Sequence, residues 1–484
     1  MNSSFSEALW TAADAAAATG GKATGSWSAT GISIDSRTVL PGDLFIALKG
    51  PNFDGHKFAA AALTAGACAA VIDMDPGDLD DTAPILQVAD TMQALRDLGV
   101  AARARTSARI IAVTGSVGKT GTKEALKFVL SRQAQTSASK GSLNNHWGLP
   151  LSLARMPSQA TFGIFEMGMN HSGEITPLSK MARPHVALIT NVEAVHTAQF
   201  ASVEAIADAK AEIFAGIEQG GMAVLNRDND HFHRLAKAAG TYGVERILSF
   251  GLSEEADFRL IEENRDAGGS SVTIDIGGHG LSYRLGIAGH HWVLNSLGVL
   301  AAVAADGGNV GEAARALGDI TAPQGRGQVH HIAIAGQSFT LIDESYNASP
   351  VSMNASFEVL GQAVPGSGGR RIAVLGDMRE LGEDSSARHA ALAEPLARNK
   401  IDLVFTAGPD MAHLFDAIDP AMRGAHAENA EALLPTVLAA IGSGDVVMIK
   451  GSHGSRTGLI VNALVAEAEK PGAMPPRVAN GGGA

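Results

Sequence analysis

A Lys-Thr pair, Lys119 and Thr120, follows a short turn whose glycines are spaced for phosphate binding. An apolar run at 110–113 precedes this turn and a helical pattern begins near residue 119, so the turn joins a buried strand to a helix. At such a junction the backbone N–H groups and the helix N-terminus face an anion, the lysine reaches the terminal phosphates, and the threonine can bind Mg²⁺. The stretch therefore predicts a phosphate site formed by Gly115, Ser116, Val117, Gly118, Lys119, Thr120 and Gly121.

This turn departs from the common phosphate-loop pattern. That pattern has a glycine six residues before the lysine, where this chain has Val113, and the first glycine here is Gly115. The alternative is an ordinary glycine turn between a strand and a helix. Because the Lys-Thr pair follows Gly118 directly and a strand precedes the turn, the sequence favours phosphate binding.

Two further polar residues follow predicted strands of the same region. Glu166 lies in the run at 162–167, near its end, and His196 follows the run at 186–191. Ligands of open α/β sheets bind beyond the carboxyl ends of the strands, so both side chains are candidates for holding Mg²⁺ beside a nucleotide. A helix-capping or surface carboxylate and a surface histidine are open alternatives for the two positions.

Several other positions have two interpretations that spacing does not separate. Lys210 lies in a predicted helix, where a surface lysine is the simpler interpretation, although a lysine in a low-dielectric site loses its proton readily. Asn144 and Asn145 lie in a polar loop that either binds substrate or forms a turn. Ser36 and Arg37 lie at the end of a predicted strand, where they either contact a diphosphate or belong to a capped turn.

Three later segments also carry polar groups. His290, His291 and Asn295 lead into a predicted helix. The segment 343–350 ends a strand with a polar cluster, and the segment 450–457 joins the last strand to a helix. That final junction is a second helix N-terminus suited to an anion.

The composition limits the class of protein. A length of 484 residues suggests about three domains of roughly 150 residues. The net charge of −13, with no Lys/Arg cluster, argues against a general nucleic-acid binder. Cys68 is the only cysteine, which excludes an intramolecular disulfide. With no signal-peptide pattern and no apolar run of membrane-spanning length, we expect a cytoplasmic protein without membrane insertion.

The elements that must position these residues form an alternating strand and helix pattern, which predicts an α/β fold of three domains. The expected domains are 1–107, a central doubly wound domain at 108–321, and a third α/β domain at 322–470, followed by a disordered tail at 471–484. The first domain has strand patterns at 32–37, 44–48 and 69–72 and a helix at 58–67. The central strands are expected at 110–113, 162–167, 186–191, 222–226 and 247–250, with a hairpin at 271–287 and a helix at 292–305. The third domain has strand patterns at 339–343, 371–375, 402–406 and 445–449.

The shortened loop resembles that of the Mur ligase and folylpolyglutamate synthetase superfamily. Further segments resemble Mur ligases of the MurF type, and the resemblance covers nearly the whole chain. These segments are 144–151, 166–174, 341–350 and 374–383, together with 35–37 and 47–56 in the first domain. The segments 341–350 and 374–383 are the most specific for this type among its sister ligases.

The resemblance implies a central P-loop ATPase domain between an N-terminal UDP-binding domain and a C-terminal Rossmann-like domain. It also implies an ATP-dependent ligase that uses Mg²⁺ and joins D-alanyl-D-alanine to UDP-N-acetylmuramoyl-tripeptide through an acyl phosphate. The product would be the pentapeptide precursor of peptidoglycan, and the enzyme would be a monomer.

The resemblance also assigns roles to matching positions. Lys119 and Thr120 would bind ATP phosphates and Mg²⁺, and Glu166, His196 and a carbamylated Lys210 would hold the metal ions. Asn295 would contact adenine, and Arg326 and Asp343 would contact ATP from the third domain. Ser36 and Arg37 would contact the uridine diphosphate. The remaining substrate contacts would come from Asn144, Asn145, Tyr346 and Asn347.

The sequence departs from the family pattern in three places, which are Gly121 in place of a second threonine, the residues after His196, and the segment 450–457. The alternatives are another ligase of the superfamily and a non-catalytic paralogue that senses UDP-muramoyl peptides. The segment 343–350 argues against the first, and the set of polar residues that would bind ATP and metal argues against the second. A P-loop kinase leaves the first domain unexplained.

Overall fold

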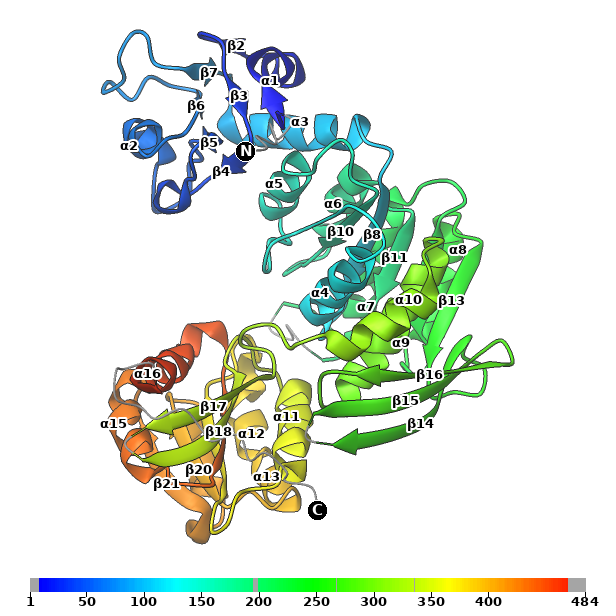
Figure 1. Ribbon diagram of the computed structural model, residues 1–484, viewed down its shortest axis with the longest axis vertical. Coiled ribbons are helices and arrows are strands. Elements are labelled where there is room, and N and C mark those ends of the chain that lie inside the picture. The colour runs from blue at the N-terminus through cyan, green and yellow to red at the C-terminus, as the bar shows by residue number, and fades with distance from the viewer. Residues whose placement is uncertain (1–7, 195–198, 267, 335, 469–484) are drawn as a thin grey trace, which may run out of the picture.

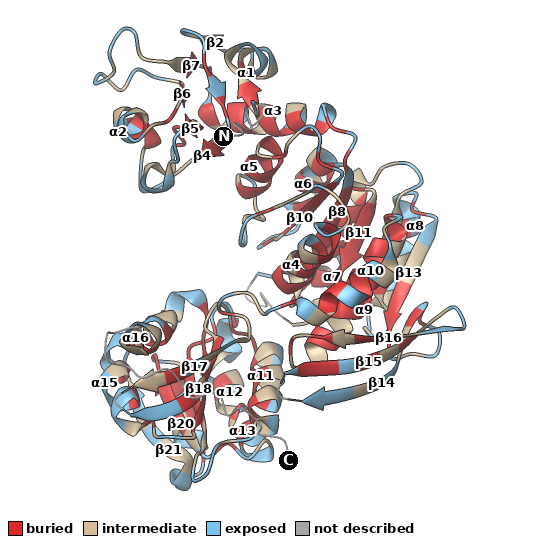
Figure 2. Cartoon of the chain, in the orientation of Figure 1, coloured by how far each residue is buried: buried red, intermediate tan, exposed pale blue. Residues whose placement is uncertain are grey.

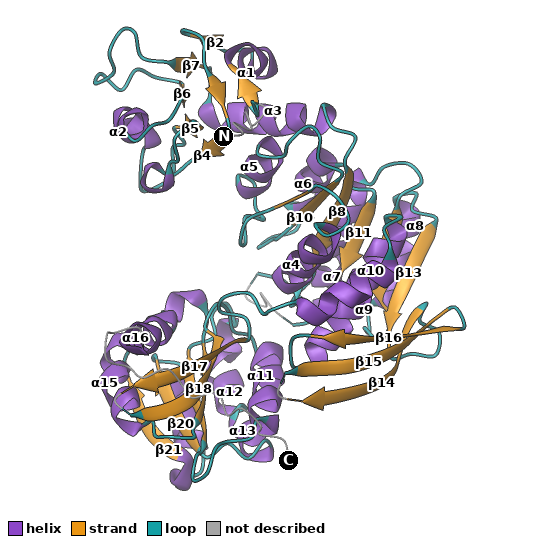
Figure 3. Ribbon diagram, viewed as in Figure 1, coloured by secondary structure: helices purple, strands orange, loops and turns teal. Residues whose placement is uncertain are grey.

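The computed structural model describes residues 8–194, 199–266, 268–334 and 336–468, which form three α/β units (Figure 1). The middle unit lies between the other two and contacts both (Figure 1). Each unit has its own sheet, with helices packed beside it (Figure 3). The three-domain α/β fold expected from the sequence is therefore confirmed. None of the helices in the described part of the chain is long and apolar enough to cross a membrane.

The N-terminal unit has a five-stranded sheet in the order β2-β7-β6-β5-β4, in which only β2 runs antiparallel to its neighbour. The strands are β2 (Lys22–Ala23), β4 (Gly31–Ser33), β5 (Asp43–Ile46), β6 (Ala69–Ile72) and β7 (Ile85–Gln87), and β1 (Trp10–Thr11) pairs with β3 (Ser28–Ala29) outside this sheet. Its helices are α1 (Ala12–Thr19), α2 (Ala59–Thr64) and α3 (Thr91–Ala104).

The middle unit has a nine-stranded sheet in the order β16-β15-β14-β13-β12-β11-β8-β10-β9. The strands are β8 (Arg109–Thr114), β9 (Thr136–Ala138), β10 (Phe162–Glu166), β11 (Val186–Ile189), β12 (Met222–Asn226), β13 (Arg246–Gly251), β14 (Phe258–Asp266), β15 (Gly269–Ile276) and β16 (His279–Leu285). All pairs from β9 to β14 are parallel, and β14, β15 and β16 form an antiparallel extension. The central strands are almost continuously buried, as expected for a parallel sheet covered on both faces (Figure 2).

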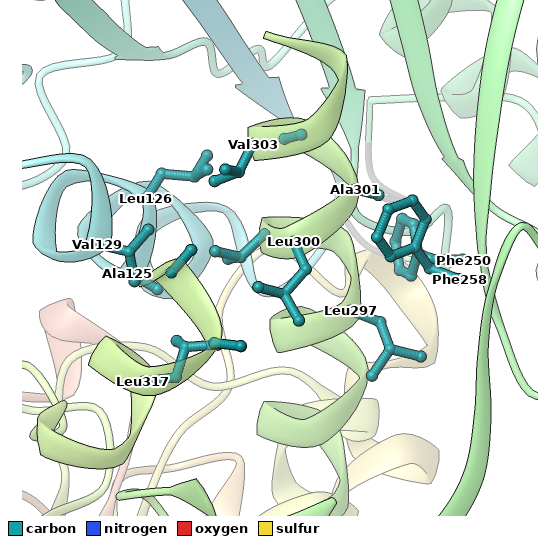
Figure 4. Close-up of a cluster of buried hydrophobic side chains, with 14 of the residues drawn as sticks. Ala125, Leu126, Val129, Phe250, Phe258, Leu297, Leu300, Ala301, Val303 and Leu317 are labelled. Atoms are coloured by element: carbon teal, nitrogen blue, oxygen red, sulfur yellow. The ribbon is translucent and has the colours of Figure 1, made fainter. Parts of the chain in front are cut away.

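Two groups of helices provide that cover. One is formed by α4 (Lys119–Leu130), α9 (His290–Ala305) and α10 (Val310–Ala316), which contact one another. Figure 4 shows apolar side chains of α4, among them Leu126 and Val129, facing Leu300 and Val303 of α9. The remaining helices of this unit are α5 (Gly148–Ala154), α6 (Ile175–Ala182), α7 (Val203–Ala211) and α8 (Phe232–Thr241). These four contribute buried side chains to a second core, which includes the other face of the strands.

The C-terminal unit has a six-stranded sheet in the order β17-β18-β22-β19-β20-β21, and only β17 is antiparallel to its neighbour. The strands are β17 (Gln328–Ile334), β18 (Gln337–Glu344), β19 (Arg371–Gly376), β20 (Leu403–Ala407), β21 (Arg423–Ala427) and β22 (Val446–Lys450). The helices are α11 (Pro350–Gln362), α12 (Ser385–Ala390), α13 (Ala393–Arg398), α14 (Met411–Ala417), α15 (Ala430–Ala440) and α16 (Gly458–Ala468).

The expected strands of the two larger sheets are confirmed to within a few residues at their ends. Within these two sheets the sequence did not predict β9, β14, β17 or β21. Charged or exposed polar residues interrupt the apolar pattern of the last three, and β9 is only three residues long. The strand pattern at 32–37 was too long: β4 ends at Ser33, and the Asp35 carboxylate accepts a hydrogen bond from the N–H of Arg37 to start a single 3-10 turn. The tail at 471–484 lies outside the described residues.

Candidate active site

A cavity of about 340 Å³ lies at the carboxyl edge of the middle sheet, where the C-terminal unit meets it. The phosphate-loop residues 116–121, Glu166 and Asn295 line it from the middle unit. Arg326, Tyr346, Asn347 and Lys450 are among the residues that line it from the C-terminal unit. The structure therefore brings together, around one space, groups that lie far apart in the sequence.

The shape of the glycine turn is set by the neighbouring strand connection. Gly115 has φ +148°, and a Cβ there would lie 1.9 Å from Oγ1 of Thr190, so only glycine allows this close approach. The N–H of Ser116 donates to the carbonyl of Asn191 at 3.0 Å, and the N–H of Val117 donates to Oδ1 of Asn191 at 2.9 Å. These contacts hold the loop above the N-terminus of α4, which begins after Gly118 at φ +86°.

The Lys119 side chain folds over this loop. Its Nζ donates to the carbonyl oxygen of Gly115 at 2.6 Å and to that of Ser116 at 3.2 Å. Burial lowers the pKa of the Lys119 amine, and the nearby Glu166 carboxylate opposes that shift. A cation in this position lies beside the helix N-terminus, where an anion is stabilised.

Glu166 and Thr120 form the centre of a buried polar group at the end of β10. The hydroxyl of Thr120 donates to Oε2 of Glu166 at 2.7 Å, and the side-chain amide of Asn144 donates to Oε1 at 2.8 Å. Glu166 is 1% exposed. Carboxylate and hydroxyl oxygens are the ligands that Mg²⁺ prefers, so this pair fits such an ion.

Lys210 is buried in α7 and is not the surface lysine that its sequence neighbourhood favoured. Burial lowers the pKa of this amine well below its usual value, and the positive charge of Lys119 lowers it further. An uncharged amine is the form that can react with carbon dioxide. His196, the other predicted metal ligand of this region, lies outside the described residues.

Arg326 reaches the cavity from a turn that Asp343 organises. The Asp343 carboxylate accepts from the N–H of Gly325 at 3.0 Å and from the hydroxyl of Ser345 at 2.6 Å. The guanidinium carbon of Arg326 lies 4.3 Å from the centre of the Tyr346 ring, within cation–π range. Asp343 is 2% exposed, and in this structure it supports the turn while Arg326 lines the cavity.

The four predicted asparagines differ in placement, and all but Asn145 line the cavity. Asn295 lies beside Gly118, where an added Cβ would be 2.9 Å from its Oδ1. Asn347 lines the cavity with its neighbour Tyr346. Oδ1 of Asn145 instead accepts from the N–H of Gly148 at 3.0 Å at the start of α5, so Asn145 shapes the turn next to Asn144.

The predicted diphosphate residues lie in the N-terminal unit. Arg37 is exposed, and its guanidinium donates to both carboxylate oxygens of Asp35 at 2.9 and 2.6 Å. These hydrogen bonds from Arg37 lower the pKa of Asp35. Ser36 begins the 3-10 turn, and neither Ser36 nor Arg37 is among the residues that line the cavity.

Sequence reasoning did not select two buried lysines as site residues. Lys450, at the end of β22, lines the cavity, and its Nζ donates to the carbonyl of Asn347 at 3.0 Å. Burial lowers its pKa, and Glu344, 3.4 Å away, opposes the shift. Lys123 of α4 donates to the carbonyls of Ser139 and Gly141 at 2.7 and 3.0 Å, which ties the loop before Asn144 to α4. The position of Lys450 at the end of an apolar strand was the available signal.

Comparison with protein-family models matches three parts of the chain, of which the first two overlap at residues 113–127. Residues 28–127 match the Mur ligase family catalytic domain, residues 113–303 match the Mur ligase middle domain, and residues 325–453 match the Mur ligase glutamate ligase domain. The cavity lies between the parts that match the second and third of these models.

Similar proteins match the chain over nearly its full length. A UDP-N-acetylmuramoyl-tripeptide–D-alanyl-D-alanine ligase of Rickettsia prowazekii is 32% identical, covering 94% of this chain and 99% of the relative. The ligase of the same name from Escherichia coli is 33% identical, covering 90% and 93% of the two chains.

Solved structures agree with these matches. A crystal structure of MurF from Acinetobacter baumannii has a TM-score of 0.80 and 30% identity, covering 94% of this chain and 99% of that one. The MurF ligase of Thermotoga maritima, solved in complex with ADP, has a TM-score of 0.73 and 28% identity, covering 91% and 98%. Together with the site geometry, these similarities show that the chain belongs to the Mur ligase family and, within it, to the MurF type.

Proposed function

We propose that this chain joins D-alanyl-D-alanine to UDP-N-acetylmuramoyl-tripeptide at the expense of ATP and forms the UDP-muramoyl-pentapeptide precursor of peptidoglycan. The observation that carries the proposal is the cavity that Lys119, Glu166 and Arg326 line from two domains. We assign the reaction to the cytoplasm, where ATP is available, and to a monomer. We keep the domain limits at 1–107, 108–321 and 322–470, with the tail at 471–484.

The chemistry follows from the poor reactivity of a carboxylate as an acyl donor. The terminal carboxylate of the tripeptide attacks the γ-phosphorus of ATP, the bond to the bridging oxygen breaks, and ADP leaves. The amine of D-alanyl-D-alanine then attacks the acyl carbon, phosphate departs with its bonding electrons, and the amine loses a proton. One amide bond forms for each ATP converted to ADP and phosphate.

The residues of the cavity suit this sequence of steps. Lys119 and the loop N–H groups would bind the β- and γ-phosphates, and Arg326 would balance the charge of the transferred phosphoryl group from the opposite domain. Asn295, beside Gly118, would contact adenine. Enclosure between two domains would keep water from the acyl phosphate, which is readily hydrolysed.

The buried oxygen ligands support a magnesium site in the middle unit. Thr120 and Glu166 would hold Mg²⁺, together with His196 and the carbamate form of Lys210. When bound, Mg²⁺ would neutralise negative charge on the phosphates. The low pKa of Lys210 favours the uncharged amine that carbamylation requires.

Two sets of residues would bind the acceptor and donor substrates. Ser36 and Arg37 would contact the uridine diphosphate, since the exposed guanidinium of Arg37 can fork onto phosphate oxygens. Asn144, Tyr346 and Asn347 line the cavity and would contact the peptide parts. Asn145 would act on the substrate through the turn that it shapes.

Phosphate release by the purified protein tests the proposal. ATP and Mg²⁺ are supplied with UDP-muramoyl tripeptide carrying either meso-diaminopimelate or lysine, with and without D-alanyl-D-alanine, and Lys119→Met is the matched control. Release that requires both substrates, with a pentapeptide product, is the expected result. Release with a different amino acid in place of the dipeptide would indicate a sister ligase. Binding of nucleotide and tripeptide without any release would indicate a sensing paralogue.

A further inference from the structure

Two glycines of the phosphate loop and α4 face two side chains of α9. A Cβ at Gly118 would lie 2.9 Å from Oδ1 of Asn295, and a Cβ at Gly121 would lie 2.8 Å from Cη2 of Trp292. Gly118 and Gly121 are three residues apart, and so are their partners Trp292 and Asn295. One turn at the start of α4 therefore packs against one turn of α9. These contacts bring the first turn of α4 closer to α9 than a larger residue at either glycine would allow.

Gly121 is not explained by its backbone conformation. It lies inside α4, outside the glycines that have positive φ, so an alanine could adopt the same backbone angles. Glycine is among the poorest helix-forming residues, and its place in the first turns of α4 therefore requires another reason. The indole ring of Trp292 occupies the space where any side chain at position 121 would extend.

Trp292 also reaches the turn that carries Arg326. Its Nε1 lies 3.8 Å from the position that a Cβ at Gly327 would take, and the N–H of Gly327 donates to the carbonyl of Asp343 at 2.8 Å. Trp292 is 4% exposed, and it lines the cavity beside Gly121. One side chain thus separates the first turn of α4 from the connection to the C-terminal unit.

We propose that Trp292 is a positioning residue for the nucleotide site and that Gly121 is the partner it requires. The indole ring sets the spacing between the first turn of α4, which carries Lys119 and Thr120, and the turn that carries Arg326. The assignment of ATP as the nucleotide rests on the function proposed above. Because the phosphates of the nucleotide would contact both sides of the cavity, a small change in this spacing weakens nucleotide binding and phosphoryl transfer together.

The first test uses reciprocal substitutions. Gly121→Thr introduces a side chain that collides with the ring edge, and we expect the KM for ATP to rise at least about tenfold. Adding Trp292→Ala to this variant removes the collision together with the positioning ring, so the KM of the double variant is expected to fall to that of Trp292→Ala alone. The matched control is Gly240→Ala in α8, where nothing lies within 4 Å of the added Cβ and no change in KM is expected.

The second test uses tryptophan fluorescence during titration with ADP. The chain has four tryptophans, and Trp10, Trp27 and Trp147 lie in or against the core of the N-terminal unit. We expect ADP to change the emission of the parent protein and of Trp27→Phe, and to leave the emission of Trp292→Phe unchanged. Trp292→Phe keeps an aromatic ring but not its reach, so its KM for ATP should rise about threefold with little change in Tm.

These measurements separate a positioning role from a merely structural one. A Gly121→Thr protein that is folded, by its Tm, and has an unchanged KM for ATP would contradict the proposal, as would a double variant whose KM exceeds that of Trp292→Ala alone. If Gly121→Thr does not fold, Trp292→Phe decides. A Trp292→Phe protein that has the KM of the parent protein, and whose emission ADP changes as much as it changes that of the parent, would overturn the role. Because ADP binding needs no ligase turnover, a parent protein that shows the ADP response but releases no phosphate would refute only the proposed reaction.

Discussion

The carboxyl edges of the middle and C-terminal sheets are built alike, but their buried polar groups have different partners. Both sheets are mainly parallel, and in both a glycine with positive φ follows an interior strand, Gly115 after β8 and Gly408 after β20. In both, an added Cβ would collide with a polar side chain from a neighbouring strand connection, which is Thr190 in the first case and Asp377 in the second. Each edge also carries buried ionisable side chains.

The ionisable groups of the middle sheet face a cavity. Lys119 donates only to carbonyl oxygens of its own loop in the described contacts, and Glu166 accepts from two side chains that line the same cavity. These hydrogen bonds can be exchanged for bonds to phosphate oxygens or a metal ion without unfolding an element. The edge is therefore suited to a ligand.

At the carboxyl edge of the C-terminal sheet Lys450 lines the same cavity, whereas Asp377 and His389, beyond the end of β19, bind the backbone instead. Asp377 accepts from the N–H of Met411 at 2.9 Å, at the start of α14. Nε2 of His389 accepts from the N–H of Met378 at 3.0 Å, so its Nδ1 carries the proton and donates to the carbonyl of Ser385 at 2.7 Å. Asp377, His389 and Asp410 lie close enough to share a cation, but the histidine nitrogens are already used. We interpret this cluster as a structural one, which shows that proximity of polar groups does not by itself make a site.

The largest expected effect is at the carboxyl edge of the middle sheet, which faces the cavity. Lys119→Met removes the cation that would meet the terminal phosphates, and we expect kcat to fall by about 10³-fold. Because burial already lowers the pKa of this amine, its removal should not lower the Tm. Phosphate-release kinetics and a thermal melt check both parts. A variant that keeps its kcat would remove the functional distinction between the two edges.

Lys210→Met is expected to separate activity from stability. We expect kcat to fall by about 10²-fold, since the proposed metal ligand is lost. The folded-state pKa of Lys210 lies well below that of the unfolded chain, so the unfolded state binds one more proton between those two values. The stability of the parent protein should therefore rise with pH across that window, and the variant should lack this slope and melt a few degrees higher at pH 7.

Thermal melts from pH 7 to pH 10, in buffer without bicarbonate or nucleotide, measure this effect. Lys237→Met, on α8, is the control for loss of a lysine that is not fully buried. If the stability of the parent protein and that of Lys210→Met changed equally with pH, the buried amine would not be the source of the pH dependence.

Glu166→Gln tests the proposed metal site at the carboxyl edge of the middle sheet. The amide is similar in size and can still accept one hydrogen bond from Thr120, but it carries no charge. We expect the Mg²⁺ concentration for half-maximal activity to rise by at least about tenfold, with a smaller effect on the Tm. Activity titrated with Mg²⁺ at saturating ATP gives the answer, and an unchanged Mg²⁺ requirement would place the metal ion elsewhere.

His389→Leu tests the structural cluster at the carboxyl edge of the C-terminal sheet and should affect stability alone. It leaves the buried N–H of Met378 without its acceptor, which costs about 1–3 kcal/mol in the free energy of unfolding. The KM for ATP should remain within about twofold, and the exposed His413→Leu should change stability by less than about 0.5 kcal/mol. A large rise in KM would mean that the C-terminal cluster takes part in the site after all.

The sequence by itself determined the local parts of this protein. A strand, a glycine turn and a helix are contiguous, so the pattern at 110–120 was sufficient to predict both β8 with α4 and the phosphate-loop geometry. The apolar runs of the parallel sheets were equally readable, because strands buried on both faces need continuous apolar residues. The family could also be recognised at this level, because its motifs are short and contiguous.

Only the tertiary structure decided which distant residues meet. Lys210 resembles a surface lysine in sequence, and its burial depends on the packing of α7 against a sheet formed by other segments. Lys450 reaches the cavity through the approach of a second domain, which no local pattern encodes. The glycine at position 121 was visible as a departure from the family pattern, but its reason, the ring of Trp292, lies on another helix. Such contacts depend on the three-dimensional packing of distant segments, and local residue periodicity carries no record of that packing.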